Sequence, residues 1–319
     1  MKTEKPKVII ITGPTAVGKT RLSIQLAKQL DADVISADSM QIYKNCNIGT
    51  AKASIDEMEG ITHHFIDICD TNDEFSVKEY KKMASEEIIE QHLYQKVSVV
   101  CGGTGLYINS IAYQLDFDER STDENIRNTL YRLYDEEGIV PIRKMLFKFD
   151  PISFNKYHEN DIKRNIRALE YFICSNVPFS SNQEGFRTPN DTFDTMLFVL
   201  NRDRQKLYNA IDDRVESMIA NGLVEEVKSL LESGTRKDAQ SMQAIGYKEV
   251  IQYLDGNFTY TEMIDKLKQH SRNYAKRQLT WFRNDPSAIF IDVDHLSEEE
   301  ILNLILTEMK KQWKMVMTS

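Results

Sequence analysis

The chain has 319 residues, of which 28% are charged and 41% hydrophobic, and its formal net charge is −9. A chain of this length can bury a large core, so we expect one large domain with an insertion, or two domains. The acidic net charge excludes a uniformly basic coat for nucleic acid, although it does not exclude local basic patches.

Signals for membrane insertion, export and disulfide formation are absent from the sequence. No apolar run approaches the roughly 20 residues of a bilayer-spanning helix, and Val8–Ile11 is too short for the hydrophobic region of a signal peptide. The four cysteines form no C-x-x-C pair, so they suggest neither a disulfide framework nor a zinc site. We therefore expect a cytoplasmic protein without membrane contact.

Strands and helices alternate in the first third of the chain. Apolar β-type runs predict strands at 7–12, 33–37, 64–68 and 97–101, and amphipathic patterns predict helices at 19–30 and 77–93. From 117 to 192 the chain is charged and helical, and then come a strand at 195–200, helices to 284, a strand at 288–293 and a helix at 297–313. This order predicts an α/β fold with a mostly parallel sheet in residues 1–116 and 193–319, and a helical insertion domain in 117–192.

A phosphate-binding motif follows the first predicted strand. The pattern G-x-x-x-x-G-K-[ST] is formed by Gly13, Pro14, Thr15, Ala16, Val17, Gly18, Lys19 and Thr20. It lies between a strand and an amphipathic helix, which is the context of a phosphate loop (P-loop) in P-loop NTPase-like folds. Loop amides and the helix N-terminus can bind an anion, Lys19 adds a positive charge, and Thr20 can ligate Mg²⁺. The motif predicts a ligand with two or more phosphates but does not show whether a phosphoryl group moves.

Polar residues also follow two other predicted strands. Asp38 and Gln41 come just after the second strand, at the edge where α/β sheets bind ligands. Asp38 can be a general base, a Mg²⁺ ligand or a turn former, and Gln41 can read an adenine edge or be a solvated loop residue. The strand at 97–101 ends in glycines and Thr104, where many nucleotide-hydrolysing P-loop proteins have a Mg²⁺-binding aspartate.

The adjacent His63 and His64 raise the question of a metal site. Neighbouring residues on a strand point to opposite faces, and no H-x-x-x-H spacing accompanies this pair. A structural or supporting role is therefore favoured over metal ligation.

Seven further segments resemble the tRNA dimethylallyltransferases (isopentenyl-tRNA transferases). They are DSMQIY, GTAKA, HHFID, CGGTGLY, RALEYF, QAIGYKE and RNYAKRQLTWFR, and together with the P-loop they extend the resemblance from Gly13 to about Arg283. The resemblance implies transfer of a dimethylallyl group from its diphosphate to N6 of the adenosine just 3′ of the tRNA anticodon, with release of pyrophosphate. The partners implied are tRNA and dimethylallyl diphosphate, with Mg²⁺ as cofactor and no obligate protein partner, so we expect a monomer.

The resemblance also implies roles for individual residues. Lys19 and Thr20, with Thr15 and the loop amides, would neutralise the diphosphate, and Mg²⁺ would assist through Thr20. The catalytic residues implied are Lys19, Asp38 as the base that accepts the N6 proton, Thr104 as a hydrogen-bond donor to the bridging oxygen, and Arg214 as a ligand of the pyrophosphate.

The expected tRNA-facing residues lie in several parts of the sequence. The segment 266–283 carries six Lys and Arg residues and no acid, with aromatic residues between them, which suits phosphate contacts and base stacking, although a solvated helix face has the same composition. The residues implied are Asp38, Ser39, Met40, Gln41, Thr104, Arg127, Lys163, Arg164, Arg167, Gln243, Tyr247, Arg272, Lys276, Arg277 and Gln278.

The sequence departs from the family pattern at three positions. Ala53 replaces a usual proline, Lys163 a usual glutamine, and Ala210 a frequent arginine. No C-x₂-C…H-x₃₋₅-H extension of the eukaryotic kind follows, so a bacterial-type enzyme is implied.

Three alternative functions fit part of the pattern. A small-molecule P-loop kinase fits the loop but lacks the strand-end aspartate. An adenylate isopentenyltransferase that acts on free nucleotide would not need the helical insertion or the basic segment. A non-catalytic RNA-binding P-loop protein would not depend on Asp38.

Overall fold

The structure is a computed structural model that describes residues 4–115, 123–183 and 187–313. The chain divides into two compact units, Met1–Ala112 with Asn190–Ser319, and Tyr113–Pro189. The second unit covers most of the stretch for which the sequence predicts a helical insertion. No helix in the described part of the chain is both long enough and apolar enough to cross a bilayer.

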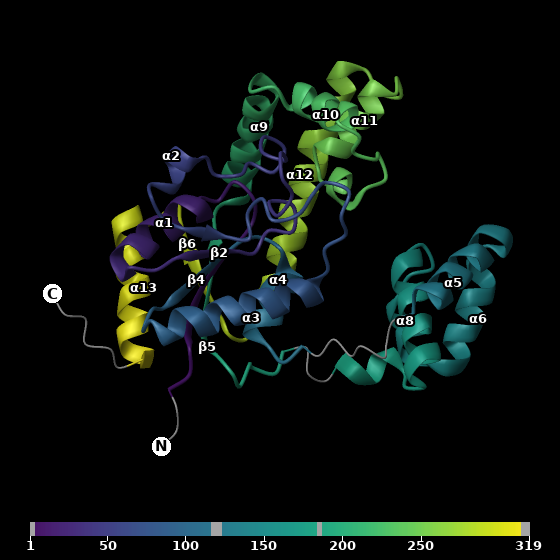
Figure 1. The fold of residues 1–319 in the computed structure, drawn as a ribbon, viewed down its shortest axis with the longest axis horizontal. Helices are drawn as coiled ribbons and strands as arrows, with labels where there is room; N and C mark the ends of the chain where they lie inside the picture. Colours follow the sequence, from purple (N-terminus) through teal and green to yellow (C-terminus); the bar gives the residue numbers. More distant parts are fainter. Residues whose placement is uncertain (1–3, 116–122, 184–186, 314–319) are drawn as a thin grey trace. The chain divides into compact units, whose positions relative to one another are not determined.

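The first unit is built around a six-stranded sheet in which every pairing is parallel (Figure 1). The strand order is β3-β2-β4-β1-β5-β6. The strands are β1 Lys7–Thr12, β2 Val34–Ser36, β3 His63–His64, β4 Ser98–Cys101, β5 Asp194–Asn201 and β6 Ala288–Asp292. The near-continuous apolar runs of β1 and β5 are explained by this topology, because the central strands of a parallel sheet are covered on both faces.

Ten helical segments accompany this sheet among the described residues. They are α1 Lys19–Leu30, α2 Ile55–Met58, α3 Val77–Leu93, α4 Gly105–Ala112, α9 Arg204–Ala220, α10 Leu223–Glu232, the short 3₁₀ helix η3 Gln240–Gln243, α11 Tyr247–Leu254, α12 Tyr260–Arg283 and α13 Glu298–Trp313. Leu22 and Leu26 of α1 and Ile305 of α13 share one buried cluster with Ile9 and Phe198 of the sheet. The two helices therefore cover one face of the sheet together (Figure 1).

The sheet order brings three loops to one edge. Parallel strands have their carboxyl ends on the same side, so the residues after β1, β2 and β4 lie next to one another. Backbone hydrogen bonds join them: Ala37 donates to Cys101 O, Gly102 to Ile11 O, and Thr104 to Ala37 O, at 2.7, 3.2 and 3.1 Å. The edge thus holds the P-loop, Asp38 and Thr104.

The second unit contains helices and no strand among its described residues. Its elements are α5 Glu124–Glu137, α6 Ile139–Phe149, α7 Pro151–Lys156, α8 Ile162–Ser175 and the 3₁₀ helix η2 Phe179–Gln183. Leu130, Ile142, Ile166 and Leu169 form its buried core, with one or two residues from each of α5, α6 and α8. Its apolar residues recur at helical spacing, which is why the sequence pattern predicted helices here.

The predicted α/β class with a parallel sheet is confirmed, and one strand prediction is wrong. The strand expected at 64–68 is only the two residues His63–His64, because Phe65 and Asp67 have φ values of 64° and 56°, which interrupt extended backbone. His63 Nδ1 is 2.9 Å from Ile61 O, and burial lowers the pKa of His63. His64 lies between two carboxylates, 3.5 Å from Asp33 and 3.3 Å from Glu87.

Candidate functional site

The P-loop leaves β1 through backbone that only glycine adopts easily. Gly13 has φ 140°, and a Cβ added there would lie 2.5 Å from Leu200 O of the neighbouring strand. Ala16 and Gly18 also have positive φ, at 62° and 99°, immediately before α1 begins at Lys19. Successive amides of this loop and the N-terminus of α1 therefore meet at the ligand-binding edge, as the motif predicts.

Lys19 is the cation at the centre of this loop. Its Nζ donates to Pro14 O at 2.8 Å. Burial, together with the nearby Arg214, lowers the pKa of Lys19 to about 8, while Cys101 and Asp38 act in the opposite direction. Lys19 is therefore positively charged at neutral pH but loses its proton far more readily than an exposed lysine.

A cavity of about 500 Å³ opens beside the loop. It is lined by Lys19 and Thr20, by Arg214 from α9, and by Glu57 and Glu59 from the α2 segment. Burial lowers the pKa of Arg214, and the Asp38 carboxylate acts against this shift. Two half-buried cations thus face a space large enough for a diphosphate group.

The second part of the site lies at the ends of β2 and β4. Thr104 Oγ1 accepts a hydrogen bond from Ser39 N at 3.0 Å and lies 3.3 Å from Ser39 Oγ. Asp38 Oδ1 accepts from Met40 N at 2.9 Å, which leaves its second oxygen available. Tyr274 of α12 belongs to the same group, because burial, with the Asp38 carboxylate as the next contribution, raises the pKa of Tyr274.

Gln278 of α12 ties these two parts together. Its Oε1 accepts from Thr15 N of the P-loop at 3.0 Å, and its Nε2 donates to Gly103 O after β4 at 2.9 Å. A Cβ on Gly103 would lie 2.2 Å from Gln278 Nε2, and one on Gly105 would lie 2.7 Å from the Trp281 ring. The glycines after β4 therefore allow α12 to approach the site closely.

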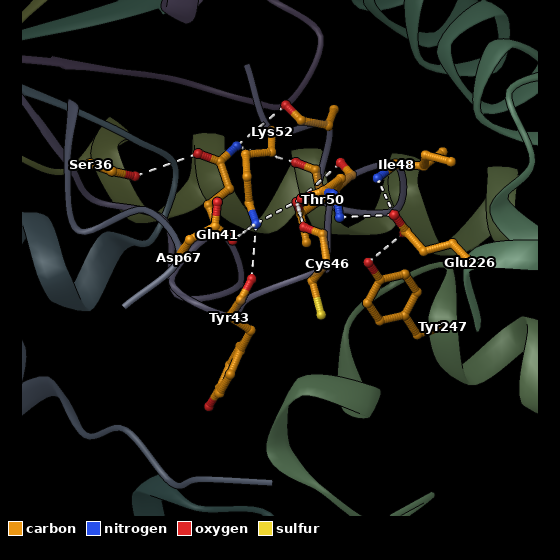
Figure 2. Close-up of polar contacts among 12 residues, drawn as sticks. Ser36, Gln41, Tyr43, Cys46, Ile48, Thr50, Lys52, Asp67, Glu226 and Tyr247 are labelled. Atoms are coloured by element: carbon orange, nitrogen blue, oxygen red, sulfur yellow. Dashed lines mark hydrogen bonds and ion pairs between the residues drawn. The ribbon is translucent and has the colours of Figure 1, made fainter. Parts of the chain in front are cut away.

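Gln41 has its amide group bound by a neighbouring loop (Figure 2). Its Nε2 donates to Thr50 O at 3.2 Å and Ala51 O at 3.4 Å, whereas its Oε1 is 3.5 Å from Ser36 Oγ. Both amide protons are thus used within the protein.

The basic segment of α12 is divided between paired and exposed cations. Arg272 is paired with Asp212 of α9 at 2.5 Å, and Lys268 is paired with Glu216. Arg277 lies over the Tyr274 ring, and both Lys276 and Arg277 are exposed. Exposed lysine and arginine side chains on one helix suit phosphate contacts, which fits the predicted role of Lys276 and Arg277.

In the helical unit, a buried carboxylate holds two of the predicted arginines. Glu170 is fully buried and accepts from Arg127 Nε and Nη2 at 3.2 and 3.1 Å, and from Arg167 Nη1 at 3.1 Å. Asp123 N also donates to it. Arg164 is paired with Asp161, and Lys163 is exposed. Arg127 therefore has a structural contact whatever else it binds.

Two further predicted tRNA-facing residues have hydrogen bonds within the protein, Tyr247 from a buried position and Gln243 from an exposed one. Tyr247 is fully buried, and its hydroxyl donates to Glu226 at 2.7 Å. Gln243 Nε2 donates to Lys237 O at 3.4 Å. Their roles in tRNA binding stay predictions.

The structure brings Lys19, Asp38, Thr104 and Arg214 to one edge of the sheet, although sequence separates the first from the last by almost two hundred positions. Sequence reasoning did not assign Tyr274 to this edge. It lies four residues before Gln278, so both project from one face of α12, and that spacing was available as a signal. Glu226 and Glu170 were not predicted as anchoring residues, because most of their partners lie far away in the sequence; only Arg167 is near, three residues before Glu170.

Comparisons with known proteins agree with the family resemblance of the sequence motifs. Residues 41–285 match the model of the family described as IPP transferase. A tRNA dimethylallyltransferase from Lachnoclostridium phytofermentans is 43% identical over 305 residues, which cover 95% of this chain and 96% of the relative. This chain belongs to the IPP transferase family.

Solved structures of family members resemble this one over nearly the whole chain. The full-length tRNA isopentenylpyrophosphate transferase from Bacillus halodurans matches with a TM-score of 0.72 and 40% identity, covering 97% of this chain and 99% of that chain. A eukaryotic dimethylallyltransferase solved acting on tRNA matches with a TM-score of 0.83 and 28% identity, covering 98% and 81%. The predicted family resemblance is confirmed.

The Arg127–Glu170 contact predicts a stability effect. Arg127→Ala leaves a dehydrated carboxylate with one guanidinium fewer, so it should lower the free energy of unfolding by about 1–2 kcal/mol. Lys163→Ala is the matched control and should stay within about 0.5 kcal/mol of wild type. Denaturant unfolding of the three proteins checks this, and equal midpoints for all three would show that Arg127 has no structural role.

Proposed function

We propose that this protein transfers a dimethylallyl group from dimethylallyl diphosphate to N6 of the adenosine 3′-adjacent to the tRNA anticodon, and releases pyrophosphate. The membership of the IPP transferase family and the 43% identity to a tRNA dimethylallyltransferase support this activity. The observation that carries it is the shared sheet edge, where Gln278 joins the P-loop to the Asp38–Thr104 group.

The donor side of the reaction needs positive charge where pyrophosphate develops. Lys19 and Arg214 supply this charge from partly dehydrated positions, where electrostatic stabilisation is stronger than in water. The Thr15 amide already donates to Gln278, so the Thr15 hydroxyl and the later loop amides are the donors that would bind the diphosphate. Thr104 Oγ1 would donate its proton to the bridging oxygen as the C–O bond breaks.

Mg²⁺ is the cofactor that this donor set fits. Mg²⁺ keeps several waters and binds through one or two protein oxygens plus substrate phosphates. Thr20 lines the cavity beside Lys19 and is exposed, and no cluster of three His, Cys, Asp or Glu residues suited to a metal occurs among the described residues. When bound at Thr20, Mg²⁺ would help to neutralise the diphosphate.

The acceptor side needs one base. As the N6 nitrogen attacks the allylic carbon, an N–C bond forms, the C–O bond breaks, and the bonding pair of the C–O bond leaves with pyrophosphate. The proton lost from N6 would pass to the oxygen of Asp38 that Met40 N does not bind.

The alternatives fit less of the molecule. A small-molecule kinase and an adenylate isopentenyltransferase would both use the P-loop, but the relatives found across nearly the whole chain are tRNA enzymes. We further propose that the protein acts in the cytoplasm, as a monomer.

The lowered pKa of Lys19 predicts a pH dependence of diphosphate binding. Lys19 is charged below about pH 8 and neutral above it, so the Kd for pyrophosphate should rise about tenfold per pH unit above that value. Lys19→Ala should bind weakly with no such slope. Calorimetric titration at several pH values measures this, and a wild-type Kd that stays flat to about pH 10 would contradict it.

The role of Asp38 is tested with two acceptors. Wild type with Mg²⁺ and labelled dimethylallyl diphosphate should modify unmodified tRNA and leave AMP unmodified, as read by mass spectrometry of nucleosides. Asp38→Asn keeps the contact with Met40 N but cannot take a proton, so turnover should fall by about 10² or more.

Asp31→Asn, at the exposed C-cap of α1, is the matched control and should behave as wild type. Modification of AMP would favour the free-nucleotide enzyme, and full turnover by Asp38→Asn would place the base elsewhere.

A further inference from the structure

Glu226 of α10 binds the backbone of a turn that contains none of the residues assigned to the proposed reaction. Glu226 Oε2 accepts from Ile48 N at 2.8 Å (Figure 2) and from Asn47 N at 2.9 Å, and its Oε1 accepts from Gly49 N at 3.0 Å. Three consecutive amides bound by one carboxylate resemble the capped start of a helix, except that the cap comes from about 180 residues later in the chain. The segment 46–52, named here the 46–52 turn, is therefore held in place by a distant helix.

Buried aromatic and cysteine side chains reinforce this contact. The Tyr247 hydroxyl donates to Glu226 Oε1 at 2.7 Å, and the Tyr247 and Cys46 side chains are both buried. A Cβ on Gly49 would lie 2.2 Å from the Tyr247 ring, so the turn packs directly on that ring. All four donors around Glu226 require a carboxylate, because an amide in its place has only one acceptor oxygen.

Lys52 holds the other end of the turn. Its ammonium group donates to Tyr43 O at 2.9 Å, Asn47 Oδ1 at 3.0 Å and Asp67 Oδ1 at 2.6 Å, and its side chain is only 5% exposed. Ala51, just before it, has φ 44°, a conformation that the surrounding contacts must maintain. The turn is thus fixed at both ends rather than free to adjust.

The carbonyls of this turn decide which way the Gln41 amide points. Thr50 O and Ala51 O can only accept, so they select the NH₂ end of Gln41 and use both of its protons. The Oε1 end accepts a long hydrogen bond from Ser36 Oγ at 3.5 Å, and an amide oxygen has two lone pairs, so this oxygen keeps its capacity to accept a second hydrogen bond. Gln41 can therefore offer a ligand an acceptor and no donor.

We infer that Glu226 is a positioning residue that, through the 46–52 turn, fixes Gln41 as a hydrogen-bond acceptor selective for a purine with an exocyclic 6-amino group. This inference rests on the proposed function, in which Asp38, three residues before Gln41, takes one N6 proton. Gln41 Oε1 would accept the other N6 proton. A 6-oxo purine would instead place its oxygen against Oε1, where neither group has a proton to share.

The test compares two anticodon stem-loops that differ at one base, adenosine or inosine at the 3′-adjacent position. Wild type should bind the adenosine form about tenfold more tightly, as expected for one hydrogen bond replaced by an oxygen–oxygen contact. Glu226→Gln should reduce this ratio to about threefold or less. Gln41→Ala should do the same, and the double variant should match either single one, because the two residues act in series.

The matched control is Glu225→Gln, an exposed neighbour on α10, which should keep the wild-type ratio. Tyr247→Phe removes one of the four donors and retains the ring, so it should lower the ratio by a smaller amount and tests the inference even if Glu226→Gln fails to fold. Unchanged ratios in both variants, or additive effects in the double variant, would overturn the inference. Wild type that transfers nothing to tRNA would overturn the proposed function instead.

Discussion

One buried amide connects the two halves of the candidate site. Gln278 is 6% exposed, accepts from the P-loop at Thr15 N and donates to Gly103 O after β4. A buried amide with both ends satisfied costs little, whereas each group left unpaired on its removal costs about 1–3 kcal/mol. Helix α12 thus holds two segments in a fixed relative position. One is the loop that would bind the departing pyrophosphate, and the other is the end of β4 that leads to Thr104.

The same principle recurs elsewhere in the molecule, where buried or half-buried carboxylates fix neighbouring segments by accepting several hydrogen bonds. Glu226 fixes the 46–52 turn, and Glu170 fixes Arg127 and Arg167 in the helical unit. Each of these carboxylates accepts several hydrogen bonds, Glu226 from the turn and from Tyr247, and Glu170 from Arg127 and Arg167. A loop held in this way can keep a functional side chain in one orientation, which catalysis and base selection both require.

The sequence predicted those parts of the molecule that depend on local pattern. The P-loop, the alternation of strands and helices, and the helical character of residues 123–175 follow from spacing and capping over short stretches. The strand at 64–68 was overpredicted, because apolar residues there are compatible with extended backbone and only the structure shows the positive φ of Phe65 and Asp67.

Contacts between distant segments could not be predicted from the sequence pattern. Gln278 was predicted as a tRNA-facing residue of the basic helix, yet it is buried and its amide is bound by two loops. Arg272 was predicted to bind tRNA phosphates, yet its Nη1 lies 2.5 Å from Asp212 Oδ1. In both cases the partner comes from another element, and single-chain periodicity carries no information about which elements meet.

The role of Gln278 in joining the two halves of the site is tested most directly by Gln278→Met, which approximately keeps the volume of the side chain and removes both hydrogen bonds. Pyrophosphate binding and dimethylallyl transfer to tRNA would be measured for this variant and for Thr280→Ala, an exposed position on the same helix. The account predicts that both quantities fall together by about tenfold in Gln278→Met and stay at wild-type values in Thr280→Ala. Wild-type pyrophosphate binding and wild-type transfer in a folded Gln278→Met protein would contradict it.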